Sequence, residues 1–303
     1  MTITLGVHRS NPSLYYLSRL EYLEEELAKV GEQGRFHHYS DGTRTGALLA
    51  DGTIDLGGTG STPPITAQAA GHDLVYTAVS APRPDHGALL VRADGPIRTV
   101  ADLKGTTVVL GVGSWQTHLL AKALHRAGLS YRDDLTAQRP TGTEAERLRD
   151  GGIAGWVAQG AELVRALRED QVRVLIRTSE VITDRSVFFT RRSFAAERPE
   201  VVGAVTAALQ RADRWVAAHL DAAAALAAAD QGGELADHRE ALSRLPWLLE
   251  PVSAAFVAEQ QEAADIFHQV GFIDRPIRLA DAQLPQLAET VAAALEGSRS
   301  NGQ

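Results

Sequence analysis

The stretch IDLGGTGSTPPITAQAAG, residues 54–71, contains a short apolar strand, a glycine-rich turn and the start of an alanine-rich helix. Proline is tolerated in the first turn of a helix, so Pro63 and Pro64 predict that the helix begins beside Ser61 and Thr62. The free N–H groups of that first turn and the positive end of the helix dipole attract anions. Alone, this pattern fits an anion site and a simple helix cap equally well.

A second stretch of the same design, GVGSWQTH at residues 111–118, follows an apolar run and precedes a helical stretch. Ligands of α/β sheets bind at the carboxyl ends of strands, which is where both turns lie. We therefore interpret the two turns as two halves of one ligand clamp.

Composition excludes several kinds of function. The chain has 303 residues, 44% hydrophobic and 22% charged, which suffices for two lobes with a buried core. No apolar run approaches the roughly 20 residues that span a bilayer, so we expect no membrane insertion. A net charge of -8 without blocks of like charge argues against a nucleic-acid partner. The chain has no cysteine, which removes disulfides, thiolate zinc sites and a cysteine nucleophile.

Neither a metal nor a cofactor is expected. His37 and His38 are adjacent at the end of a predicted strand, and neighbouring residues of a strand point to opposite faces. We therefore favour structural or surface roles for this pair over a metal site.

The order of predicted elements indicates an α/β fold. Strands alternate with helices from residue 2 to residue 79, and the pattern restarts at residues 106–110, which marks a second lobe. Apolar residues at helical spacing predict one helix over 14–30, and the apolar strand 186–190 would lead back to the first lobe. From Phe194 onwards the chain is predicted to be nearly all helix.

These motifs, in this order, resemble the aliphatic-sulfonate, nitrate and taurine substrate-binding proteins of ABC importers. Besides residues 54–71, the likeness rests on GPIRTVADLKGTTVVLGVGS (95–114), FFTRRSFAAERPEVV (188–202) and QQEAADIFHQVGFI (260–273). The resemblance implies a two-lobed periplasmic-binding-protein-like fold, in which each lobe is a mostly parallel sheet flanked by helices. Lobe one would comprise residues 1–87 and 188–303, including a helical C-terminal part, and lobe two residues 88–187, with a ligand cleft between them.

The resemblance also implies a site built from both lobes. Its members would be Arg9, Ser10, Asn11, Thr43, Gly60, Ser61 and Thr62 in lobe one, and Ser114, Trp115, Gln116, Thr117, Trp156 and Arg185 in or near lobe two. We favour ligand contact over helix capping for the hydroxyls of Ser61, Thr62, Ser114 and Thr117. Two roles stay open for Arg9, which could bind an anion or lie in a solvated turn. Two also stay open for Trp156, which could form an apolar wall of the site or belong to the core.

Two functions remain open. The first is capture of a small organic anion, most plausibly a sulfonate-like oxyanion, by an ABC-importer solute-binding protein that works with a permease. The alternative is a cytoplasmic enzyme on the same fold, acting on a small sulfur-containing or other anionic metabolite with His8 or His118 as acid and base. The opening MTITLGVHRS has no signal-peptide pattern. We expect a cytoplasmic protein if Met1 is the native start, and an extracytoplasmic one if a signal peptide has been removed.

Overall fold

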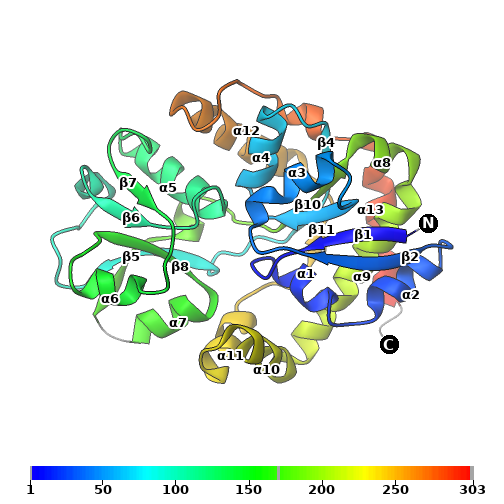
Figure 1. Cartoon of the computed structure of the whole chain (residues 1–303), viewed down its shortest axis with the longest axis horizontal. Helices are drawn as coiled ribbons and strands as arrows, with labels where there is room; N and C mark the ends of the chain where they lie inside the picture. The colour runs from blue at the N-terminus through cyan, green and yellow to red at the C-terminus, as the bar shows by residue number, and fades with distance from the viewer. Residues whose placement is uncertain (1, 169–170, 301–303) are drawn as a thin grey trace.

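The computed structural model describes residues 2–168 and 171–300 and contains two sheets, which define two lobes (Figure 1). The sheet of lobe one has the order β11-β4-β10-β3-β1-β2. Its strands are β1 Thr2–Val7, β2 Gln33–His38, β3 Leu56–Thr59, β4 Leu74–Ser80, β10 Val187–Arg191 and β11 Leu249–Glu250. The sheet of lobe two has the order β7-β6-β8-β5-β9. Its strands are β5 Gly87–Arg92, β6 Thr107–Val109, β7 Thr136–Gln138, β8 Gly155–Gln159 and β9 Val172–Arg177.

Most strands of each sheet run in one direction. In lobe one, β1 pairs in parallel with β2 and β3, whereas β10 is antiparallel to β3 and β4. In lobe two, β6 pairs in parallel with β7 and β8, and β5 is antiparallel to β8 and β9. The predicted α/β fold is confirmed. Both sheets are mixed, because β10 and β11 in lobe one and β5 in lobe two run antiparallel to their neighbours.

Helices cover both sheets. Lobe one carries α1 Pro12–Leu17, α2 Tyr22–Ala28, α3 Thr45–Ala50 and α4 Thr62–Ala69. Lobe two carries α5 Trp115–Arg126, α6 Glu144–Arg149 and α7 Gly160–Arg168. Short 3₁₀ turns lie at η1 Gly42–Arg44, η2 Val100–Leu103, η3 Thr178–Glu180 and η4 Leu279–Ala282.

The single helix predicted over residues 14–30 is wrong, because the chain breaks between α1 and α2. The N–H groups of Arg19 and Leu20 bond carbonyls three residues back instead of four, which closes the first helix. The Arg19 guanidinium also donates to the carbonyl of Tyr15. The apolar spacing continues through the break, since Leu17 and Leu23 are both fully buried.

The C-terminal helices lie against both lobes. They are α8 Arg192–Glu197, α9 Pro199–Ala218, α10 Leu220–Gln231, α11 Leu235–Ser243, α12 Ala254–Gln269 and α13 Pro285–Ser300. Helix α11 contacts α7, where Asp237 pairs with Arg168, and α12 contacts α5, where Glu262 pairs with Lys122 at 2.7 Å. In Figure 1, α10 and α11 lie below the junction of the lobes and α12 lies above it.

Two chain segments, 81–86 and 178–186, cross between the lobes, and a buried charged cluster joins them. Asp184 accepts from Arg83 at 3.0 Å and from His86 Nδ1 at 2.7 Å. Burial opposes ionisation of Asp184, but the Arg83 guanidinium and the hydrogen bonds from Arg83 and His86 hold the pKa of its carboxyl below the ordinary value. The carboxylate therefore stays charged and ties the two crossovers together.

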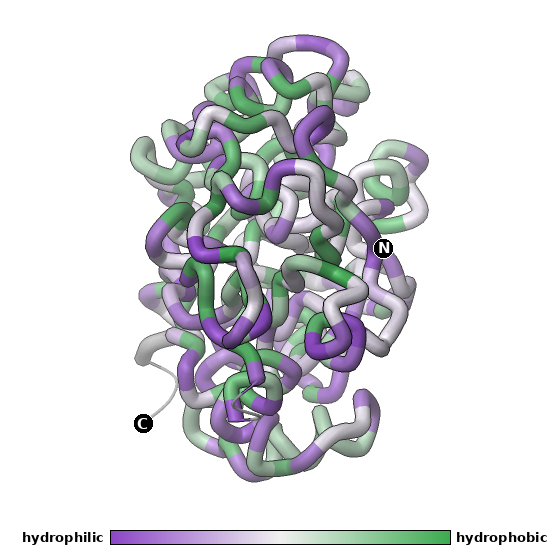
Figure 2. The backbone as a smooth tube through the Cα atoms, turned by 90° about the vertical axis from the view of Figure 1, so that its left-hand side faces the viewer, coloured by the Kyte–Doolittle hydropathy of each residue, from purple (hydrophilic) through white to green (hydrophobic). Residues whose placement is uncertain are grey.

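The interior of each lobe is apolar. Leu5 and Leu56, opposite each other in the sheet of lobe one, are almost fully buried, as are Val108 and Leu120 in lobe two. Figure 2 shows hydrophobic and hydrophilic stretches alternating along the outer helices, as expected of helices with one buried face. Within residues 2–168 and 171–300, no helix combines the length and hydropathy that a membrane span needs.

Candidate ligand-binding site

The two glycine- and serine-containing turns predicted to form a clamp face each other across the junction of the lobes. Ser61, after β3 in lobe one, and His118, on α5 in lobe two, are 3.0 Å apart, Oγ to Nδ1. Both side chains are buried. Ser61 makes no side-chain cap to α4, so its hydroxyl bonds across the cleft rather than to its own helix.

Trp115 fills the space beside this hydrogen bond. A Cβ placed on Gly60 would lie 2.7 Å from Trp115 Cβ, so the absence of a side chain at Gly60 lets the two turns approach. The indole ring also lies against Gly87 at the start of β5 and against the ring of His86, with 5.2 Å between ring centroids. Its Nε1 donates to Gln159 Oε1 at 3.0 Å, and the indole is 5% exposed.

The lobe-two turn holds its own side chains in place. Ser114 Oγ donates to the carbonyl of Gly111 and accepts from the N–H of Gln116, so it caps α5. Gln116 accepts from the N–H of Gly111 and donates to Gln159, while Thr117 Oγ1 accepts from the N–H of Gly113. These bonds order the loop, and Gln159, which sequence reasoning did not single out, anchors it. Its place at the carboxyl end of β8 was the available signal.

Four buried polar atoms around the clamp have no hydrogen-bond partner among the described residues. They are His8 Nδ1, Asn11 Nδ2, Thr62 Oγ1 and His118 Nε2. The side chains that carry them are at most 4% exposed. His8 and Asn11 follow β1, Thr62 follows β3, and His118 lies on α5, the helix after β6. All four therefore lie at the carboxyl edges of the two sheets. Buried polar groups are usually paired, so these four atoms are available as partners for a ligand.

The histidines of this region are neutral at pH 7. Burial lowers the pKa of His8, in spite of the Gly58 carbonyl and Asp41, which favour the charged ring. Burial, together with the nearby charge of Lys122, lowers the pKa of His118 to about 3. A ring with so low a pKa is a weak general base at pH 7.

Other predicted residues line the rim. Arg9 and Ser10 are exposed in the turn after β1. Burial raises the pKa of Glu162 on α7, and Arg9 lies near enough to oppose that rise. Thr43 approaches Gly113 of lobe two, whose added Cβ would meet Thr43 Cγ2 at 3.0 Å.

Two predicted residues lie away from the clamp. Trp156 is 3% exposed and packs in the core of lobe two with Leu90 and Leu148, which is the core role that the sequence left open. Arg185 Nη1 donates to the carbonyl of Ser80 and pairs with Glu250 at 2.6 Å, whereas its buried Nε has no partner among the described residues.

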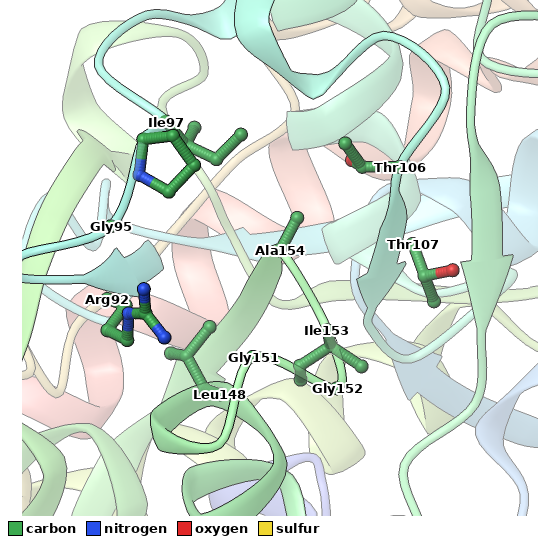
Figure 3. A pocket seen from close by; sticks show the side chains of 11 residues that line it. Arg92, Gly95, Ile97, Thr106, Thr107, Leu148, Gly151, Gly152, Ile153 and Ala154 are labelled. Atoms are coloured by element: carbon green, nitrogen blue, oxygen red, sulfur yellow. The ribbon is translucent and has the colours of Figure 1, made fainter.

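A separate cavity of about 440 Å³ lies in lobe two (Figure 3). Its walls come from the start of β6, the end of β5 and the loop before β8, at the opposite edge of the sheet from the clamp. Ile97, Leu148, Ile153 and Ala154 make it largely apolar. Arg92 also lines the cavity, and its guanidinium pairs with Asp94 at 2.8 Å. None of the predicted site residues lines this cavity.

Comparison with known proteins identifies relatives over most of the chain. The family described as NMT1/THI5 like matches residues 30–223. A protein of Escherichia coli strain K12 that carries the name of an aliphatic sulfonates-binding protein is 33% identical over 75% of this chain and 71% of its own length.

Solved structures agree with this match. The periplasmic aliphatic sulphonate binding protein SsuA from Escherichia coli superposes with a TM-score of 0.80 at 28% identity, covering 93% of this chain and 92% of that one. The alkanesulfonate-binding protein SsuA from Xanthomonas axonopodis pv. citri, bound to MOPS, gives a TM-score of 0.79 at 26% identity, covering 93% of this chain and 98% of that one.

Proposed function

This chain belongs to the NMT1/THI5-like family, and from that membership we propose that it binds a small organic sulfonate in the cleft between its two lobes. The relatives in which sulfonate binding is named cover most of the chain. The protein acts as the solute-binding component of an ABC importer, handing its ligand to a permease from the extracytoplasmic side. We propose that lobe one comprises residues 1–87 and 188–303 and lobe two residues 88–187.

One observation carries this proposal: the four unpartnered polar atoms at the clamp. Thr62 supplies a hydroxyl and Asn11 an amide, both neutral donors that suit the oxygens of a singly charged sulfonate. Because Thr62 opens α4, an anion beside it also gains from the dipole of that helix. Ser61, Thr43 and Gly60 complete the lobe-one wall in this proposal.

Lobe two supplies the opposite wall. Trp115 offers an apolar face for the organic part of the ligand, with Ser114, Gln116 and Thr117 holding the turn that carries it. Arg9 and Ser10 stand at the entrance, where the guanidinium attracts an approaching anion. Closure of the lobes over the ligand excludes water and strengthens these contacts.

The alternative of an enzyme with His8 or His118 as acid and base has less support. The pKa of His118, lowered to about 3, suits a neutral hydrogen-bonding group better than a base. Within the described part of the chain, no carboxylate hydrogen-bonds either ring. Binding without chemistry is therefore the function that we propose.

A thermal-unfolding screen tests the proposal. Purified protein is heated with linear alkanesulfonates, with MOPS, and with sulfate, nitrate and phosphate as controls. A ligand that binds only the native state at a hundred times its Kd adds about 2.7 kcal/mol to the free energy of unfolding. We expect sulfonates to raise Tm and to be recovered unchanged by mass spectrometry. Absence of any shift with sulfonates would contradict the proposal, and conversion of a bound ligand would favour the enzyme.

A further inference from the structure

His8 carries a buried hydrogen-bond acceptor that has no partner among the described residues. Its Nε2 is 2.8 Å from the carbonyl oxygen of Gly58. A carbonyl only accepts, so Nε2 carries the hydrogen. Burial lowers the pKa of the ring, which is neutral near pH 7, and Nδ1 therefore has a lone pair and no hydrogen. This nitrogen has no partner, although the side chain is only 4% exposed.

No described neighbour supplies the missing donor to His8. The ring of Tyr39 is nearby, with 5.5 Å between centroids, but its hydroxyl is hydrogen-bonded to Thr45 Oγ1 at 2.6 Å. The ring also lies against Gly42, which has no side chain. A Cβ added to Gly42 would lie 2.7 Å from the ring of His8. Among the described residues, none donates a hydrogen bond to Nδ1.

Asn11 presents an unpaired donor in the same region. Its Oδ1 accepts from the N–H of Leu14 at 3.2 Å, which fixes the orientation of the amide and leaves Nδ2 as the free group. The side chain is 2% exposed. Both side chains reach Gly58, since a Cβ on that glycine would lie 3.1 Å from Asn11 Nδ2 and its carbonyl accepts from His8 Nε2. Because Nε2 points to this carbonyl, the unpaired Nδ1 of His8 faces away from Gly58.

We propose that His8 selects a sulfonate that carries a hydroxyl group on its carbon chain. A hydroxyl can donate to His8 Nδ1, whereas Asn11 Nδ2 can donate to an oxygen of the sulfonate group. Sulfonate oxygens only accept hydrogen bonds, so the acid group cannot be the partner of Nδ1. A plain alkanesulfonate would leave the buried Nδ1 unpaired, and such a group strongly disfavours the analogue that lacks the hydroxyl. This inference rests on the proposed binding of sulfonates and names the subclass.

Matched ligand pairs of equal heavy-atom count test the inference by calorimetry. One pair is 2-hydroxyethanesulfonate and propane-1-sulfonate, and the next is 3-hydroxypropane-1-sulfonate and butane-1-sulfonate. We expect the hydroxylated member of at least one pair to bind about tenfold or more tighter. Equal affinity within both pairs would overturn the inference while leaving sulfonate binding intact. If neither member of any pair binds, the proposed function fails as well.

Variants assign the preference to the ring. In His8→Phe we expect the affinity ratio within the selective pair to fall to about one. The matched control is His38→Phe, the same change at an exposed position at the end of β2, and it should keep the wild-type ratio. Long-range ¹H–¹⁵N spectra of the wild-type protein provide a test that needs no variant. They should show hydrogen on Nε2 of His8, and a ring with hydrogen on Nδ1 would overturn the inference.

Discussion

Ser61 Oγ and His118 Nδ1 are 3.0 Å apart although they belong to different lobes and are separated by 57 residues of sequence. Neither group is exposed to solvent in this arrangement. The hydrogen bond can form only when the lobes are together, so it stabilises the closed conformation relative to an open one.

Removing the hydroxyl of Ser61 should weaken ligand binding. In Ser61→Ala, closure leaves His118 Nδ1 buried and unpaired, which costs about 1–3 kcal/mol. We expect a five- to hundredfold lower sulfonate affinity by calorimetry, and less compaction on ligand addition by small-angle scattering. Ser243→Ala, which removes an exposed hydroxyl bonded within its own helix, is the control. Unchanged affinity in Ser61→Ala would show that this bond does not contribute to closure.

A methyl group at Gly60 should prevent full closure. The added Cβ would lie 2.7 Å from Trp115 Cβ, an atom fixed to the backbone that cannot turn away. We expect Gly60→Ala to lower sulfonate affinity at least about tenfold, because a misfit of this size prevents dense packing. Scattering should show a larger radius of gyration with ligand than in the wild type. Gly152→Ala, whose Cβ would have its nearest neighbour at 3.5 Å, should behave like the wild type.

Thr62→Val should stabilise the ligand-free protein and weaken binding. The hydroxyl of Thr62 is fully buried without a partner, so an isosteric methyl removes an unsatisfied group worth about 1–2 kcal/mol. Ligand affinity should fall about tenfold if that hydroxyl donates to the sulfonate. Thermal unfolding with and without ligand measures both effects. In Thr206→Val the lost hydroxyl is one that donates to Val202, so this variant should be destabilised and bind normally. A drop in ligand-free stability of Thr62→Val would contradict the assignment.

Asp213, buried on α9, should make the protein less stable as pH rises. Burial raises the pKa of its carboxyl to about 7, against 3.8 for an ordinary aspartate. Between about pH 4 and 7 the unfolded chain has lost this proton while the folded protein keeps it. The free energy of unfolding therefore falls with rising pH across that window and levels off above it.

Asp213→Asn removes this titration. Denaturant unfolding at pH 5 and pH 8 measures the effect. From pH 5 to pH 8 the free energy of unfolding of the variant should rise by at least about 1 kcal/mol relative to that of the wild type, since one pKa unit corresponds to about 1.4 kcal/mol. The control Asp221→Asn changes a carboxylate that is 79% exposed and should follow the wild type. A gain of equal size in both variants would remove Asp213 as the cause.

The sequence was informative where local chemistry and sheet geometry coincide. Pro63 and Pro64 marked the start of α4, and the strand-turn-helix rule placed Ser61 and Ser114 at facing edges. The same rule was silent on what each hydroxyl bonds: Ser114 caps its own helix, while Ser61 bonds His118 of the other lobe. That outcome depends on how the lobes meet, which no local pattern encodes.

Long-range contacts account for what the sequence did not predict. Asp184 is about a hundred residues from Arg83 and His86, and none of the three belongs to a motif. The break between α1 and α2 was missed for a different reason. The apolar residues keep their helical spacing through it, so the hydrophobic pattern gives no sign of a turn.

The C-terminal helices give the affinity of this protein a second point of control, far from the ligand. Helix α11 holds lobe two through Asp237 and Arg168, and α12 holds it through Glu262 and Lys122. Opening the cleft must shift or break these contacts, so they help to set the fraction of molecules that are closed before any ligand arrives. Apparent affinity scales with that fraction. Substitutions on the outer surface of the molecule can therefore retune how tightly it binds while every residue that touches the ligand stays the same.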